Sequence, residues 1–171
     1  MYARLLLVCF LAGCSQKSGA DADIKKTAKA QAEEIQSGLI KGDFEKVADR
    51  THPKAVKALG GREKMLTTLR DGMKEMKEDG FEFKAVKMHE PSDPVKVGQD
   101  IYIVVPFNLE MSAKGQRLQT AGALLGVSSD GGKTWVFVDT APGRENIKGM
   151  FPDMPDSLVI PKQEMPTLVK D

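Results

Sequence analysis

The chain contains 171 residues, of which 41% are hydrophobic and 29% are charged. This is enough apolar material for one core without a second domain. Its 25 lysines and arginines nearly balance its 24 aspartates and glutamates, so no overall positive field is present to attract nucleic acid or an anionic membrane surface. We therefore expect no nucleic-acid partner.

The first residues have the composition of a targeting segment. Arg4 precedes an apolar run over residues 5–11, which is too short for a bilayer span of about 20 residues. The run ends in the sequence LAGC at residues 11–14, which resembles the lipobox of bacterial lipoproteins. An ordinary secretory signal, or the start of a cytosolic protein, is the alternative interpretation.

The lipobox resemblance implies that residues 1–13 are a signal peptide and that Cys14 carries diacylglycerol with fatty acyl chains such as palmitate. The mature protein would then be anchored to a membrane of the bacterial cell envelope. Ser15 is similar to the signal for transfer to the outer membrane, facing the periplasm, if the host is Gram-negative. Because Cys9 leaves with the signal, no thiol remains for a disulfide or a cysteine-based metal site. Residues 14–22 should form a flexible tether.

Four helical segments are predicted ahead of the strands. Apolar residues repeat at steps of three or four from Ile24 to Leu39, so one side of this helix can face a core. Gly42 is suited to end the helix and Asp43 to cap a short second helix that stops near residue 51.

A third short helix should begin at Pro53, because proline is well suited to the first helical turn. A longer fourth helix is predicted over residues 62–79, with apolar side chains on one side. Gly72 inside this helix indicates close packing against a neighbour.

The main strand signal lies in residues 100–139. Apolar and polar residues alternate along residues 101–112, a period of two that places one side of a strand in a core. Further strands are predicted over residues 117–128 and 134–139, and an earlier one over residues 81–89 with a bulge. We expect a curved antiparallel sheet whose buried face is covered by the preceding helices.

The connection between the last two strands carries a spaced motif. Ser128, Asp130, Gly132, Thr134 and Trp135 fit the pattern S-x-D-x-G-x-T-W, which is similar to the Asp-box of sialidases and related propellers. In that motif the carboxylate accepts hydrogen bonds from turn amides, glycine takes a positive φ and tryptophan packs beneath. The chain has one copy and is too short for propeller blades of about 40–45 residues each. We therefore expect a structural turn without a catalytic role.

The order of helices followed by a curved antiparallel sheet resembles the NTF2-like, or cystatin-like, α+β superfamily. The resemblance covers residues 23–141, and residues 51–61 are also similar to secreted NTF2-like proteins of unknown function. It implies a cone of helices on a curved sheet that encloses a pocket. A plain α+β domain of another topology is the alternative, and a dimer through the sheet remains open.

Residues 142–171 form a C-terminal extension punctuated by prolines, which exclude a long helix or a strand ladder. The extension contains too many apolar residues for a solvated tail. We expect it to pack along the domain with only its last residues loose. Docking to a partner protein is the alternative.

Few residues carry recognisable chemistry. His52 and His89 are the only histidines, and neither has the spacing of a metal site. Methionines such as Met73 and Met76 favour flexible core filling over copper coordination. Neither a phosphate-binding glycine loop nor a nucleophile elbow occurs. We expect no metal and no cofactor.

Two classes of function remain. A binding module would hold a small apolar ligand or an envelope protein partner in the cone. The NTF2-like resemblance also implies an isomerase, dehydratase or hydrolase, with Asp49 and His52 as acid/base and Tyr102 as donor. The first helix has no tyrosine, histidine or aspartate on its inner face, so we favour non-enzymatic binding or scaffolding. Asp49, His52, Tyr102 and Trp135 are the predicted pocket residues.

Overall fold

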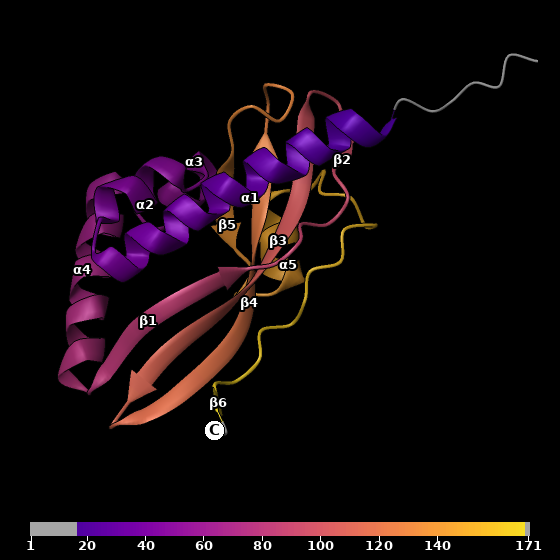
Figure 1. The fold of residues 1–171 in the computed structure, drawn as a ribbon. Coiled ribbons are helices and arrows are strands. Elements are labelled where there is room, and N and C mark those ends of the chain that lie inside the picture. The colour runs from indigo at the N-terminus through magenta and orange to yellow at the C-terminus, as the bar shows by residue number, and fades with distance from the viewer. Residues whose placement is uncertain (1–16, 170–171) are drawn as a thin grey trace, which may run out of the picture.

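The protein folds into helices and one open antiparallel sheet, as described by a computed structural model that covers residues 17–169 (Figure 1). The helices are α1 (Lys17–Lys41), α2 (Phe44–Arg50), α3 (Pro53–Ala58), α4 (Arg62–Glu78) and α5 (Arg144–Met150). The strands are β1 (Phe81–Met88), β2 (Val95–Val97), β3 (Asp100–Ala113), β4 (Gln116–Ser128), β5 (Val136–Asp139) and β6 (Thr167–Leu168). The predicted α+β class is confirmed.

The long hairpin of β3 and β4 forms the centre of the sheet. Its register runs from Ala113 opposite Gln116 to Ile101 opposite Ser128. The sheet order is β1-β3-β4-β5, with β2 also on β3 and β6 on β4. The register of β1 against β3 shifts between Phe83 and Ala85, which confirms the predicted bulge.

One face of the sheet is covered by the first helices. α1 crosses this face diagonally (Figure 1), and its fully buried Ala28 and Ala32 share a core with Ile103 and Val105 of β3. Alanine lets a helix lie close to the strands because its side chain is short. α2 and α4 add Val47, Ala48, Met65 and Leu66 to the same core.

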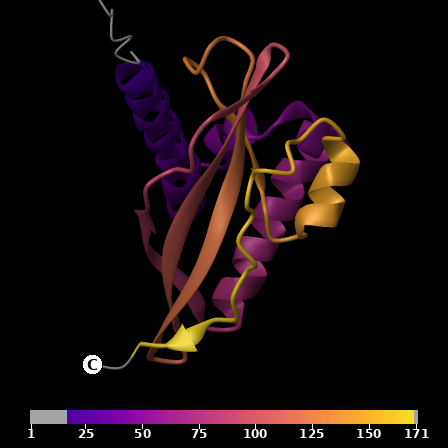
Figure 2. The ribbon, with the colours of Figure 1, turned by 90° about the vertical axis from the view of Figure 1, so that its right-hand side faces the viewer.

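The other face of the sheet is also buried. Tyr102 and Val104, which alternate with the helix-facing residues of β3, pack with Ile147 of α5 and Phe151 of the segment that follows. Figure 2 shows α1 and α5 on opposite sides of the sheet. The expectation of a sheet with one buried face is therefore wrong, because the C-terminal extension covers the second one.

The start of α1 also differs from the prediction. The helix begins at Lys17, so the flexible tether predicted for residues 14–22 is wrong from Lys17 onward. Residues from Ile24 onward dock on the sheet, and adding turns to a docked helix avoids the cost of nucleation. The predicted signal peptide and Cys14 lie outside the described residues.

Local signals at the helix ends are confirmed. Gly42 has a φ of 74° just after α1, and the Asp43 carboxylate accepts a hydrogen bond from the Lys46 backbone N at 3.2 Å. Pro53 occupies the first turn of α3. These features depend on neighbours within four residues, which is why the sequence alone reveals them.

Candidate functional site

The turn between β4 and β5 is held together by a carboxylate. Asp130 accepts hydrogen bonds from the backbone N atoms of Lys133 and Thr134 at 3.0 and 2.9 Å. It also accepts from the hydroxyls of Thr134 and Ser128, at 2.6 and 2.9 Å. These bonds hold the pKa of the Asp130 carboxyl well below its ordinary range, and the bond from the Thr134 hydroxyl makes the largest contribution to this shift. Both carboxylate oxygens of Asp130 are therefore engaged in building the turn.

The same turn docks on α1. The Thr27 hydroxyl donates to the Gly132 carbonyl at 2.8 Å, and the Gln31 amide donates to the Lys133 carbonyl at 2.8 Å. The Gln31 side-chain oxygen accepts from the Trp135 backbone N, also at 2.8 Å. Trp135 is buried, and its indole N–H donates to the Gly132 carbonyl at 3.0 Å. Its predicted place in a pocket is wrong, because the ring fills the core beneath the turn.

Asp49 and His52 do not form an acid/base pair. Asp49 is an exposed residue of α2 whose carboxylate lies 2.7 Å from the Arg62 guanidinium. The shallow pocket that Asp49 lines does not include His52. The His52 ring meets the Phe151 ring edge-on, with 4.7 Å between centroids. The enzyme hypothesis thereby loses the pair on which it was based.

His52 has a structural position at the start of α3. Its Nδ1 accepts a hydrogen bond from the Lys54 backbone N at 3.1 Å, which satisfies a free donor of the first helical turn. Burial lowers the pKa of His52, and the Lys54 ammonium lowers it further while Asp100 opposes the shift. The ring is consequently neutral at pH 7, as an acceptor must be.

Tyr102 lies on the opposite side of the sheet from Trp135. It is 4% exposed and belongs to the core on the α5 side of the sheet, whereas Trp135 belongs to the core on the α1 side. Burial raises the pKa of the Tyr102 phenol. The four predicted residues therefore line no common cavity.

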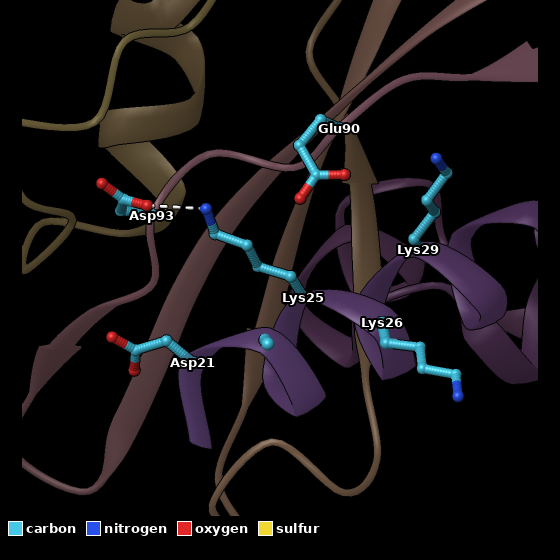
Figure 3. Close-up of a pocket in the computed structure, with 7 residues that line it drawn as sticks. Asp21, Lys25, Lys26, Lys29, Glu90 and Asp93 are labelled. Atoms are coloured by element: carbon cyan, nitrogen blue, oxygen red, sulfur yellow. Dashed lines mark ion pairs between the residues drawn. The ribbon is translucent and has the colours of Figure 1, made fainter. Parts of the chain in front are cut away.

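A polar hollow lies beside the N-terminal half of α1 (Figure 3). Its volume is about 560 Å³, and the Lys25 ammonium crosses it to an ion pair with Asp93 at 2.7 Å. Lys26 and Lys29 point away from this pair (Figure 3). Its lining is Asp21, Ala22, Lys25, Lys26, Lys29, Glu90 and Asp93. Because its lining contains three lysines and three acids, this hollow has the character of solvated surface.

Two adjoining grooves lie beside α4, and the larger one is much more apolar than this hollow. The larger one, of about 610 Å³, is called the acidic-edged groove and is lined by Leu39, Thr68, Leu69, Gly72, Met73, Glu75, Met76, Asp79, Phe81, Phe83, Met111 and Pro166. The second, of about 400 Å³, is called the lysine-edged groove and is lined by Ile40, Lys41, Gly42, Phe44, Met73, Lys74, Met76, Lys77, Phe81, Glu82 and Phe83. Both volumes lie in the range of small-molecule sites, about 300–1,000 Å³.

Four residues line both grooves, namely Met73 and Met76 of α4 and Phe81 and Phe83 of β1. We call them the methionine–phenylalanine wall. All four are half-buried, so apolar surface remains open to a ligand. The prediction that Met73 and Met76 fill the core is therefore wrong, although Met65 of the same helix does so.

Gly72 opens the larger groove. A β-carbon placed on it would meet no heavy atom within 4 Å, so the predicted close packing at this position is wrong. Sequence analysis did not identify the residues that line these grooves. Two features of the sequence could have indicated them: Gly72 directly precedes Met73, and Phe81 and Phe83 lie on the same side of a strand.

The described residues contain no group of three or more His, Cys, Asp and Glu side chains arranged to hold a metal ion. None of the helices within residues 17–169 combines the length and apolar character that a membrane crossing requires. No protein-family model matches the chain, and no curated protein matches it.

Proposed function

We propose that the chain is a lipid-anchored protein of the bacterial cell envelope whose domain binds an apolar ligand without catalysing a reaction. The LAGC sequence at residues 11–14 supports the anchor. The element order supports membership of the NTF2-like superfamily. The two grooves beside α4 support the binding role, and the enzyme alternative has no acid/base pair in its favour.

The observation that carries the binding role is the methionine–phenylalanine wall. Its four apolar side chains remain half-buried in the folded chain, and exposed apolar surface of this kind is typical of binding sites. Methionine is flexible and polarizable, so Met73 and Met76 can adjust to ligands of different shape. An apolar ligand would remove this surface from water, at about 25 cal/mol per Å².

Filling the larger groove tests the binding role. In the full chain with Cys14→Ser, which carries no acyl group, the fluorescence of N-phenyl-1-naphthylamine should rise on binding. Gly72→Trp should weaken binding at least about tenfold, or 1.4 kcal/mol, because its side chain enters the groove. Gly149→Trp is the matched control, since Gly149 also lies in a helix and a β-carbon placed on it would likewise meet no heavy atom within 4 Å. Undiminished binding by Gly72→Trp would contradict the proposal.

The anchor has an independent test. Mass spectrometry of the protein from its native membrane should find a mature N-terminus at Cys14 carrying the mass of its acyl chains. A mature chain that begins elsewhere, or retains Met1, would refute the lipid anchor without affecting the groove.

A further inference from the structure

The lysine-edged groove combines an apolar floor with a cationic border. Lys41 at the end of α1 and Lys74 and Lys77 of α4 line it, with Glu82 as its single acidic residue. Glu82 is already ion-paired with Lys84 on the same strand. The border therefore has an excess of positive charge.

The lysines keep most of that charge available. Lys74 is 3.8 Å from Glu78, and both side chains are largely exposed. Such exposed pairs contribute little, about 0–1 kcal/mol, so an incoming anion can compete for the ammonium group. Lys41 and Lys77 are also exposed.

The acidic-edged groove has the opposite border. Glu75 and Asp79 line it, and no lysine does. At 3.6 residues per helical turn, Glu75 and Asp79 lie on one flank of Met76, and Lys74 and Lys77 on the other. An anionic group would be repelled at the acidic flank and attracted at the lysine flank, which orients any ligand that has one charged end.

The grooves lie far from the chain end that precedes α1. α1 has 25 residues, and at 1.5 Å per residue it is about 37 Å long. Leu39, Ile40 and Lys41 at its C-terminal end line the grooves, and Figure 1 shows this end beside α4 and β1, opposite the end that begins at Lys17. In a chain anchored through Cys14, the grooves would lie at the end of α1 farther from the anchor, which favours a ligand taken up as a free molecule.

We infer that the two grooves bind a single-chain anionic amphiphile, of the class of free long-chain carboxylic acids. The hydrocarbon chain lies along the methionine–phenylalanine wall, and the carboxylate lies among Lys41, Lys74 and Lys77. This inference rests on the proposed binding function and adds the chemical class and orientation of the ligand.

Dodecanoate and 1-dodecanol form a matched pair of ligands, because they share a chain length and differ in charge. Each is titrated against N-phenyl-1-naphthylamine bound to the full chain with Cys14→Ser, at pH 7.5. Dodecanoate should displace the probe at lower concentration than the alcohol. Lys74→Gln with Lys77→Gln should weaken dodecanoate binding roughly three- to tenfold and leave binding of the alcohol unchanged. It should also reduce the salt dependence of the preference for the acid, because only Lys41 remains.

Lys26→Gln with Lys29→Gln is the charge-matched control. These two lysines have the same spacing on a helix but border the polar hollow of α1, so dodecanoate binding should be unchanged. Vesicles of phosphatidylglycerol should not displace the probe, since the proposed ligand is a free monomer.

The outcomes separate the two proposals. The protein could bind the probe but have equal affinity for dodecanoate and 1-dodecanol, or dodecanoate binding could be unaffected by Lys74→Gln with Lys77→Gln. Either result would overturn this inference and leave the apolar binding function intact. Displacement by vesicles would overturn the free-monomer assignment. Failure to bind the probe or either ligand would refute the binding function itself.

Discussion

Two adjacent glycines in the turn between β4 and β5 allow the docking of this turn on α1 to be measured. Gly131 and Gly132 have φ values of 78° and 89°, so alanine at either position costs about 1–2 kcal/mol of conformational energy. They differ in their surroundings. A β-carbon on Gly132 would lie 2.8 Å from the Ile24 side chain of α1, whereas one on Gly131 would meet nothing within 4 Å.

We expect Gly132→Ala to be more destabilising than Gly131→Ala by about 1–3 kcal/mol, the cost of overpacking a fixed contact. Equilibrium urea unfolding followed by tryptophan fluorescence measures this difference, since Trp135 is buried beneath the turn. With a slope of about 2 kcal/mol per molar urea, the two midpoints should be separated by roughly 0.5–1.5 M.

A double-mutant cycle identifies the contact responsible. Ile24→Ala removes the atom that the new β-carbon would strike, so in this background Gly132→Ala should cost no more than Gly131→Ala. Equal midpoints for the two single glycine variants, or an undiminished effect of Gly132→Ala in the Ile24→Ala background, would refute the packing of the turn on α1.

Three further predictions concern other parts of the molecule. The lowered pKa of His52 means that the unfolded chain binds the proton at higher pH than the folded chain, so the stability present above pH 6.5 should be lost as pH falls through the folded pKa. His52→Asn, which keeps a cap acceptor, should reduce this loss when urea unfolding is measured as a function of pH. An unchanged pH profile in the variant would contradict the role assigned to His52. Asp130→Ala should lower the urea midpoint more than Asp93→Ala, which removes a single exposed ion pair, and equal shifts would rule out the carboxylate as the organiser of the turn. Oxidation of Met73 and Met76 to sulfoxides by peroxide should weaken binding of N-phenyl-1-naphthylamine, because it makes the methionine–phenylalanine wall polar. The double variant Met73→Leu with Met76→Leu should keep its binding after the same treatment. Equal loss of binding in both proteins would place the binding surface elsewhere.

Much of the local structure was predictable because its causes lie close together in the chain. The end of α1 at Gly42, the cap at Asp43 and the bulge in β1 each follow from backbone geometry or side-chain pattern within a few residues. The hydrogen bonds around Asp130 span at most four residues. The α+β class also followed, since the period of apolar residues changes from helical to alternating along the chain.

The burial of both sheet faces depended on tertiary structure. Residues 101–105 of β3 are buried without interruption, and such a run signals burial on two sides. The sequence does not say what covers the second face. The second face is covered because Phe151 and Leu158 of the C-terminal extension pack against Tyr102 and Val104. This packing depends on complementary shapes of segments about 50 residues apart in the chain.

The candidate site also depended on packing between distant elements. Asp49, His52 and Tyr102 were grouped because their types suggested chemistry. In the fold Asp49 is an exposed ion-pair partner of Arg62, whereas the His52 ring packs on Phe151, which shares a buried core with Tyr102. The grooves exist because α4 meets β1 through the methionine–phenylalanine wall without closing the space beside it. Periodicity determines which side of each element is apolar. How far two apolar sides close upon each other is decided only when the side chains of separate elements pack. Here the closure is incomplete, and it leaves the surface that we propose for binding.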